Sequence, residues 1–261
     1  MEITNIISSH IKSKTPISFL KYGDGEYICV ISKGMNNDHN CDYDNYTPKL
    51  SEAVLKSFKY MVEHADNSYI GMWEHENIAQ YWQSQVSKPV KWAKYDTIIN
   101  FFEKDKEDTK NKVELLKVIK NSNLEKIIIC NSLLIKSKIL LNIDYMINIP
   151  INNWFDSQFD IVMDKFKQII NPNKQYIIMT CCGMSAKVVI AELYKLYPNN
   201  IYLDIGSGID EICTKRNTRN HKPLYDLFMK YYNELIPADW DDNKYYYIYD
   251  IARKNLGTYI N

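Results

Sequence analysis

Glycine is scarce in this sequence, and several common signals are missing from it. Only 8 of the 261 residues are glycine, and basic and acidic residues balance at 32 each. Without a basic excess, the wrapping of nucleic acid is not expected. No apolar run reaches the roughly 18 residues of a membrane-spanning helix, so no transmembrane segment is expected. Residues 1–14 also lack the charged start and the long apolar stretch of a signal peptide.

The cysteines show neither the spacing of a disulfide framework nor that of a zinc site. Several lie in apolar runs, where a thiol packs like a small core side chain. We therefore expect a reducing, cytoplasmic compartment. Cys182 precedes a predicted helix, a position that can lower the pKa of a thiol, although a buried, inert thiol is the favoured interpretation. The six are Cys29, Cys41, Cys130, Cys181, Cys182 and Cys213.

Short apolar runs alternate along the chain with amphipathic stretches, in which apolar residues recur at three- and four-residue spacing. The apolar runs predict strands at Ile17–Lys21, Ser68–Met72, Lys126–Cys130, Tyr145–Ile149, Tyr176–Cys181 and Ile201–Ile205. The amphipathic stretches predict helices at Gly25–Ser32, Pro48–His64, Asn77–Ser87, Lys110–Asn121, Leu133–Leu140, Trp154–Ile170, Ser185–Tyr197 and Lys222–Leu235. This order is typical of an α/β fold with a Rossmann-like, mainly parallel sheet and helices on both faces. We expect a single domain over residues 1–261, with residues 222–261 as a covering segment.

Five of the eight glycines directly follow predicted strands. They occur in the segments LKYGDGE, MTCCGMSAK and YLDIGSGID, as Gly23, Gly25, Gly183, Gly206 and Gly208. Ligands of open α/β sheets bind beyond the carboxyl ends of the strands, and glycine lets the backbone approach a ligand closely. We therefore predict that the three turns form one crevice. Simple tight turns are the alternative interpretation.

The second and third turns carry groups that suit an anionic phosphate. Gly183, Ser185 and Lys187 stand at the start of a predicted helix, where free N–H groups and a lysine can bind phosphate. Asp204 lies on the last predicted strand, and Gly206 directly follows that strand. There the Asp204 carboxylate would hold a ribose hydroxyl or brace the turn. We predict that one of these two turns faces the ligand.

Two carboxylates, Asp24 and Glu26, stand in the first turn. Beside a phosphate they would repel the ligand, unless Mg²⁺ or Mn²⁺, which prefers oxygen ligands, bridges them to it. On an extended segment, residues two apart lie on the same face, so both side chains would reach one cation. Helix capping is the rival interpretation, with Asp24 as the cap and Glu26 in the first helical turn.

Three segments together resemble the GT-D fold glycosyltransferases. KYGDGE matches a pattern of an aromatic or basic residue followed by Gly-Asp-Gly-Glu near the N-terminus. CGMSAKVVIAELYKLYPNNIYLDIG matches a later Gly-x-x-Ala-Lys turn, a helix and an Asp-x-Gly strand end. The middle segment INIPINNWFDSQFDIVMDKF resembles the family's proline-containing strand end and the helix after it. The resemblance covers residues 17–211. It departs after Gly206, where family members often continue with a histidine.

The resemblance implies a metal-dependent glycosyltransferase that moves a sugar from a nucleotide-sugar donor, usually a UDP-sugar, to a glycan or glycoprotein acceptor. It places the Asp-x-Glu metal motif, which binds Mn²⁺ or Mg²⁺, on Asp24 and Glu26. It also places Tyr22 and Gly23 beside the donor.

An inverting transfer needs a base that takes the proton of the acceptor hydroxyl. Asp210 and Glu211 follow the third turn, and Glu211 is slightly favoured because of its distance from the Asp-x-Gly match. Further on, Arg216, Arg219 and Lys222 form a basic cluster. A C-terminal loop could bring it over the diphosphate, and ordinary solvation of the three side chains is the alternative interpretation.

Two other functions stay open. YLDIGSGID alone also looks like the first motif of class I methyltransferases, which cradles S-adenosylmethionine. In that fold most of the sheet follows the motif, but only 53 residues follow Gly208 here. The second alternative is a non-catalytic, Rossmann-like binding module. A P-loop kinase and a serine hydrolase are disfavoured, because neither G-x-x-x-x-G-K-[ST] nor G-x-S-x-G occurs.

Overall fold

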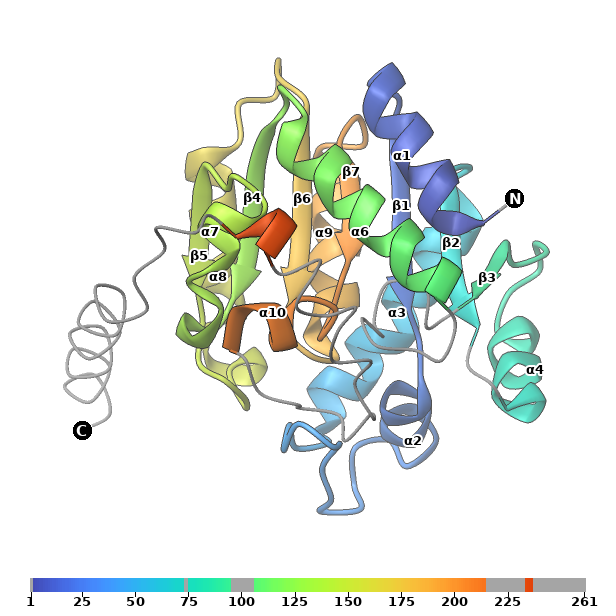
Figure 1. Ribbon diagram of the computed structural model, residues 1–261. Coiled ribbons are helices and arrows are strands. Elements are labelled where there is room, and N and C mark those ends of the chain that lie inside the picture. Colours follow the sequence, from blue (N-terminus) through green and yellow to red (C-terminus); the bar gives the residue numbers. More distant parts are fainter. Residues whose placement is uncertain (1, 73–74, 95–105, 215–232, 237–261) are drawn as a thin grey trace, which may run out of the picture.

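The computed structural model describes residues 2–72, 75–94, 106–214 and 233–236 (Figure 1). Its strands are β1 (Ile17–Lys21), β2 (Ser68–Met72), β3 (Trp92–Lys94), β4 (Glu125–Cys130), β5 (Tyr145–Asn148), β6 (Tyr176–Cys181) and β7 (Ile201–Asp204). Its helices are α1 (Ile3–Ser13), α2 (Asp24–Ile31), α3 (Pro48–His64), α4 (Glu76–Ser84), α6 (Lys106–Asn121), α7 (Ser137–Leu140), α8 (Phe155–Ile169), α9 (Ser185–Leu196) and α10 (Asp210–Thr214), with a 3₁₀ turn η1 (Ser132–Leu134). Within these ranges, no helix is long and apolar enough to cross a bilayer.

The strands form one parallel sheet in the order β3-β2-β1-β7-β6-β4-β5. Strand β7 lies between β1 and β6, with Ile17 opposite Ile201 and Ile177 also opposite Ile201. The turns after β6, β7 and β1 are therefore neighbours at the carboxyl edge of the sheet, the edge at which ligands of open parallel sheets bind. This arrangement brings together the three glycine-containing turns that the sequence predicted to be adjacent.

Side chains alternate along each strand between two hydrophobic cores, one on each face of the sheet. In β1, Leu20 packs in the core beneath α3, α8 and α9, whereas Ile17 and Phe19 pack in the core with α1 and α6. Figure 1 shows α1 and α6 crossing one face of the sheet, with α3 and α9 on the other. Helices therefore cover both faces, as a parallel sheet requires.

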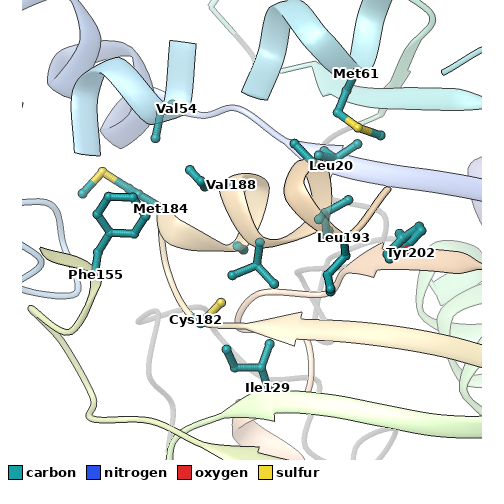
Figure 2. Packing of buried hydrophobic residues seen from close by; sticks show 14 of the residues in the cluster. Leu20, Val54, Met61, Ile129, Phe155, Cys182, Met184, Val188, Leu193 and Tyr202 are labelled. Carbon is teal, nitrogen blue, oxygen red and sulfur yellow. The ribbon is translucent and has the colours of Figure 1, made fainter. Parts of the chain in front are cut away.

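Helix α9 is enclosed by its neighbours along most of its length. Its residues from Ser185 to Ala191 are all buried. Figure 2 shows Val188 and Leu193 of α9 between Val54 and Met61 of α3 on one side and Ile129 of β4 on the other. Because this packing fixes the helix from all sides, the polar residues in its first turn are held in defined positions.

The predicted fold class, an α/β fold with a mainly parallel sheet and helices on both faces, is confirmed. Six predicted strands are present, and β1, β2 and β6 have the predicted bounds. Three elements were not predicted. Strand β3 has only three residues, too few for a pattern, and α10 has five. Helix α1 was missed although Ile3, Ile7 and Ile11 repeat at four-residue spacing and are buried.

Of the expected covering segment, residues 222–261, the structure describes 233–236. Leu235 and Ile236 are buried in the core with α1 and α6. Lys117 of α6 lies 2.8 Å from the Glu234 carboxylate, and Lys120 donates a hydrogen bond of 2.9 Å to the Leu235 carbonyl. These four residues therefore pack on α6. The rest of the predicted helix Lys222–Leu235 lies outside the described residues.

Tyr22, directly after β1, has its ring in the core and its hydroxyl on a buried polar group. The ring centroid lies 5.0 Å from that of Phe58 and 5.1 Å from that of Trp82. The hydroxyl shares a hydrogen bond of 3.0 Å with Ser57, which also donates to the Val54 carbonyl at 2.7 Å.

Tyr22→Phe is therefore expected to lower the free energy of unfolding by about 1 kcal/mol, because one buried hydrogen bond is lost while Ser57 keeps its other partner. Urea denaturation followed by circular dichroism measures this change. Tyr43→Phe is the control, since Tyr43 is 66% exposed and its hydroxyl can bond to water. Equal effects of the two variants would contradict the prediction.

Candidate functional site

Four charged side chains from three strand ends meet in a buried cluster at the carboxyl edge of the sheet. Lys187, in the first turn of α9, lies 2.6 Å from Glu26 Oε1 and 3.2 Å from Asp204 Oδ2. Lys21 ends β1, and its Nζ lies 3.8 Å from Asp204 Oδ1. All four side chains are at least nine-tenths buried. Two positive and two negative charges therefore alternate in the order Lys21, Asp204, Lys187, Glu26, which we call the charge ladder.

Glu26 has a partner for each of its carboxylate oxygens. Oε1 lies against Lys187, and Oε2 accepts a hydrogen bond of 2.8 Å from the Gly23 N–H. Gly23 is the N-cap of α2, and Glu26 is the third residue of the helix. In a capping box the third residue accepts from the N–H of the cap, and Glu26 makes this contact, whereas glycine has no side chain for the reciprocal one. Glu26 thus fixes the start of α2 and joins it to α9.

Asp24 lies on a different side of α2 from Glu26. Helix α2 begins at Asp24, so the expectation of an extended segment with both carboxylates on one face is wrong. Residues two apart on a helix point about 200° apart. Asp24 is exposed, and its Oδ1 accepts a hydrogen bond of 2.9 Å from the Gly25 N–H. No group of three or more His, Cys, Asp or Glu side chains placed for a metal occurs within the described ranges.

Asp204 braces the end of β1, and Lys21 covers the Gly206 turn. Asp204 Oδ2 accepts a hydrogen bond of 3.2 Å from the Lys21 N–H. Gly206 has a φ of 48°, and any Cβ at this residue would collide with Lys21 Nζ. Burial lowers the pKa of the Lys21 ammonium, which Asp204 raises in part. Within the described residues, the ion-pair partner of this buried cation is the Asp204 carboxylate, 3.8 Å away.

The Gly183 turn, between β6 and α9, is covered by a carboxylate from another loop. Gly183 has a φ of 63°, and any Cβ here would collide with Oδ2 of Asp44. Asp44 belongs to the loop between α2 and α3, and its Oδ1 accepts a hydrogen bond of 2.9 Å from the Asn153 N–H after β5. Lys187 also donates a hydrogen bond of 3.2 Å to the Gly183 carbonyl. The turn is thus bounded by one anionic and one cationic side chain.

The other predicted ligand-binding residues lie at or near these turns. Gly23 caps α2, and Ser185 is buried in the first turn of α9. The side chain of Tyr22 packs in the core, so a contact between this residue and a donor would involve its backbone. Burial raises the pKa of the Cys182 thiol well above its usual range, which agrees with an inert thiol.

Asp210 belongs to the element that follows the Gly206 turn. It begins α10, whose apolar residues pack in the core with α1 and α6, whereas Lys187 belongs to a helix on the opposite face. The charge of Asp210 raises the pKa of Cys130 and Cys213, after the burial of these thiols. The side chain of Glu211 lies outside the described residues, as do Arg216, Arg219 and Lys222.

Sequence reasoning missed Lys21 and Asp44 as site residues. Lys21 carried a signal, because it is the one charged residue of an otherwise apolar or hydroxylic strand, Ile17–Lys21. Asp44 lies in NNDHNCDYDNY, which reads as a solvated loop. Its burial follows from contacts with residues more than 100 positions later in the chain.

The sequence matches no family model, and no curated protein matches it significantly. The fold resembles solved structures of a domain called domain of unknown function 1792 (DUF1792). A structure described as "A New Glycosyltransferase (DUF1792) from Streptococcus sanguinis" has a TM-score of 0.57, with 92% of this chain and 94% of that chain covered at 14% identity. Another, described with the words "The highly conserved domain of unknown function 1792 has a distinct glycosyltransferase fold", has a TM-score of 0.55, with coverages of 92% and 90% at 14% identity.

At 14% sequence identity, the similarity to these structures shows a shared fold and nothing further. The charge ladder and the three glycine turns stand at the carboxyl edge of that fold, where parallel sheets bind ligands. The chain therefore has the fold that its DUF1792 neighbours share, and which one of them is described as a distinct glycosyltransferase fold.

Proposed function

We propose that this protein is a metal-dependent glycosyltransferase, which moves a sugar from a nucleotide-sugar donor, most often a UDP-sugar, to a glycan or glycoprotein acceptor. The observation that carries this proposal is the buried charge ladder beside the Gly183 and Gly206 turns, in a fold shared with proteins described as glycosyltransferases. Buried charges are costly to maintain for stability alone, and their clustering at a ligand-binding edge favours a functional role.

The charges favour the Gly206 turn over the Gly183 turn as the place of the donor diphosphate. At Gly183 an anion would meet the Asp44 carboxylate, whereas at Gly206 it would approach the Lys21 ammonium. An incoming anion would also offset the desolvation of Lys21, which has one carboxylate 3.8 Å away. Lys187 is a weaker candidate for this contact, because Glu26, Asp204 and the Gly183 carbonyl already accept from it.

Asp24 fits a divalent cation better than Glu26 does. It is exposed, and among the described residues its one hydrogen bond is the contact of Oδ1 with the neighbouring Gly25 N–H. Glu26 would first have to leave Lys187. Mg²⁺ and Mn²⁺ are commonly held by one or two carboxylates together with the phosphates of the substrate. When bound there, the cation would offset negative charge on the departing nucleoside diphosphate.

The methyltransferase alternative is weakened by the position of the Asp-x-Gly-x-Gly turn in the chain. Strand β7, which leads into the turn, is the last strand of the described residues, whereas in the methyltransferase fold most of the sheet follows this motif.

A screen of nucleotide sugars with Mn²⁺ tests the proposed function. We expect one or more UDP-sugars to be hydrolysed slowly, with water in place of the acceptor, and excess EDTA to abolish the hydrolysis because the cation stabilises the leaving group. Released nucleotide and calorimetric binding are the measurements, and S-adenosylmethionine is the control ligand. Full activity in EDTA would contradict the metal requirement. Binding of no nucleotide sugar would favour a binding module, and binding of S-adenosylmethionine a methyltransferase.

A further inference from the structure

The loop between α2 and α3 is built to hold one residue, Asp44, in a fixed position. Asn40 Oδ1 accepts hydrogen bonds of 2.9 Å from the N–H groups of both Asp42 and Asp44. The Asn40 N–H donates to the Asp44 carbonyl at 3.0 Å, and the Tyr46 N–H donates to the Asp38 carbonyl at 2.9 Å. These hydrogen bonds join the two ends of the loop and fix the backbone that carries the Asp44 carboxylate.

The Asp44 carboxylate is 6% exposed, and its two oxygens differ. Oδ1 accepts the Asn153 N–H at 2.9 Å. Oδ2 faces Gly183 and occupies the space that a side chain at residue 183 would fill. Among the described residues no hydrogen bond to Oδ2 is found. Oδ2 therefore keeps its capacity to accept a hydrogen bond from a ligand that supplies a donor.

The place of Asp44 relative to the charge ladder favours a role in catalysis over a role in phosphate binding. Lys187 and Glu26 act on it electrostatically, and Gly183 is next to Cys182 and close to Lys187 in the same turn. As an anion it would repel a diphosphate but accept a proton from a hydroxyl. Asp210, the base predicted from the sequence, lies on α10 toward the other face of the sheet.

We propose that Asp44 is the catalytic base of the transfer, and that its Oδ2 receives the hydroxyl of the acceptor. The inference rests on the proposed function. As the acceptor oxygen bonds to the anomeric carbon, its proton passes to Asp44, and the bond from that carbon to the nucleoside diphosphate breaks with its electron pair on the diphosphate. The protonated Asp44 then returns the proton to water. A single displacement of this kind inverts the anomeric configuration.

The surroundings of Asp44 suit this task near neutral pH. Burial raises its pKa to about 6, the Asn153 N–H lowers it, Asp42 and Glu26 raise it, and Lys187 lowers it; the Cys182 thiol also lies within reach. A carboxylic acid with a raised folded-state pKa holds its proton in the folded protein at pH values where the unfolded chain has released it. Stability from this group therefore falls as pH rises from about 4 to about 6, so Asp44→Asn should not lower the melting temperature at pH 7.5.

The test compares Asp44→Asn with Asp42→Asn in the donor-hydrolysis assay, on the full chain with Mn²⁺ and the UDP-sugar that the screen selects. Asparagine can keep the contact with Asn153, so the loop should stay in place. We expect Asp44→Asn to lower kcat by about 10²-fold or more, with an unchanged donor Kd, and to lose the rise in rate through about pH 6 that the wild type shows. Asp42→Asn removes the same charge from the same loop and should stay within about twofold of the wild type.

Proton NMR of the sugar first released should show inversion. Retention of configuration, near-normal turnover of Asp44→Asn, a loss of donor affinity in place of turnover, or a large fall in its melting temperature would each overturn the assignment. So would loss of turnover in Asp210→Asn while Asp44→Asn stays active. If the wild type binds no nucleotide sugar at all, the proposed function fails, and the role of Asp44 fails with it. If only the Asp44 arm fails, the proposed function stands.

Discussion

Lys187→Met is expected to lower the free energy of unfolding by about 3–5 kcal/mol, because it removes the central cation of the charge ladder. Glu26 and Asp204 are buried, and both now lie within 3.2 Å of Lys187 Nζ. In the variant Glu26 would lose this ion pair, and Asp204 would keep the more distant ammonium of Lys21, 3.8 Å away. Methionine has a similar length and fits an apolar pocket, so the loss measures charge more than volume. Urea denaturation followed by circular dichroism gives the free energy.

Lys167→Met is the matched control for this variant. Lys167 of α8 forms an ion pair of 2.9 Å with Asp164, but both side chains are more than half exposed, so solvent screens the pair and its loss should matter little. Adding Glu26→Gln to Lys187→Met should recover part of the stability, because the charge of Glu26, which has lost its ion pair with Lys187, is then removed. If Lys187→Met and Lys167→Met lost the same stability, the charge ladder would have no structural role.

Asp24→Asn is expected to lower the turnover of the nucleotide sugar by about 10²-fold or more, while the free energy of unfolding changes little. The proposed cation loses its exposed carboxylate ligand, and each ~1.4 kcal/mol of lost transition-state stabilisation is tenfold in rate. The hydrogen bond from the Gly25 N–H to Oδ1, 2.9 Å long, can persist with asparagine. Mn²⁺ binding, followed by electron paramagnetic resonance, should weaken in parallel with turnover.

Asp38→Asn serves as the control, because Asp38 is also exposed and also accepts a hydrogen bond, of 2.8 Å, from the N–H of the next residue, His39. It should leave both turnover and Mn²⁺ binding unchanged. If Asp24→Asn unfolded at much lower urea while each folded molecule stayed active, Asp24 would be a helix cap, as the rival interpretation of the sequence holds.

Long-range order was easier to predict from this sequence than local geometry at the site. Buried parallel strands such as Tyr176–Cys181 are continuously apolar, and helices such as Pro48–His64 carry a strong helical repeat, so each signal extends over many residues. The placement of Gly25, Gly183 and Gly206 at one edge followed from their positions directly after predicted strands of a parallel sheet. None of these inferences needed a contact between particular side chains.

The details of the site were harder to predict, because they depend on the exact residue at which α2 begins and on contacts between residues far apart in the sequence. The sequence predicted that α2 begins at Gly25, but it begins at Asp24, and this difference moves Asp24 and Glu26 from one face to two. Whether the Glu26 carboxylate binds a metal ion or pairs with the Lys187 ammonium depends on residues more than 150 positions apart. The position of Asp44 depends likewise on Asn153 and Gly183, which no local pattern near residue 44 predicts.

Strand β7 has a consequence for how the chain folds. It joins two half-sheets, β3-β2-β1 and β6-β4-β5, which have no other strand between them. During synthesis from the N-terminus, residues 17–19 therefore wait for residues 201–203 before their edge is paired. Pairing over such a sequence separation is slow, and an unpaired edge can associate with other chains in the meantime. Because Asp204 directly follows these residues, the chain acquires its charge ladder in the same late step that closes its sheet.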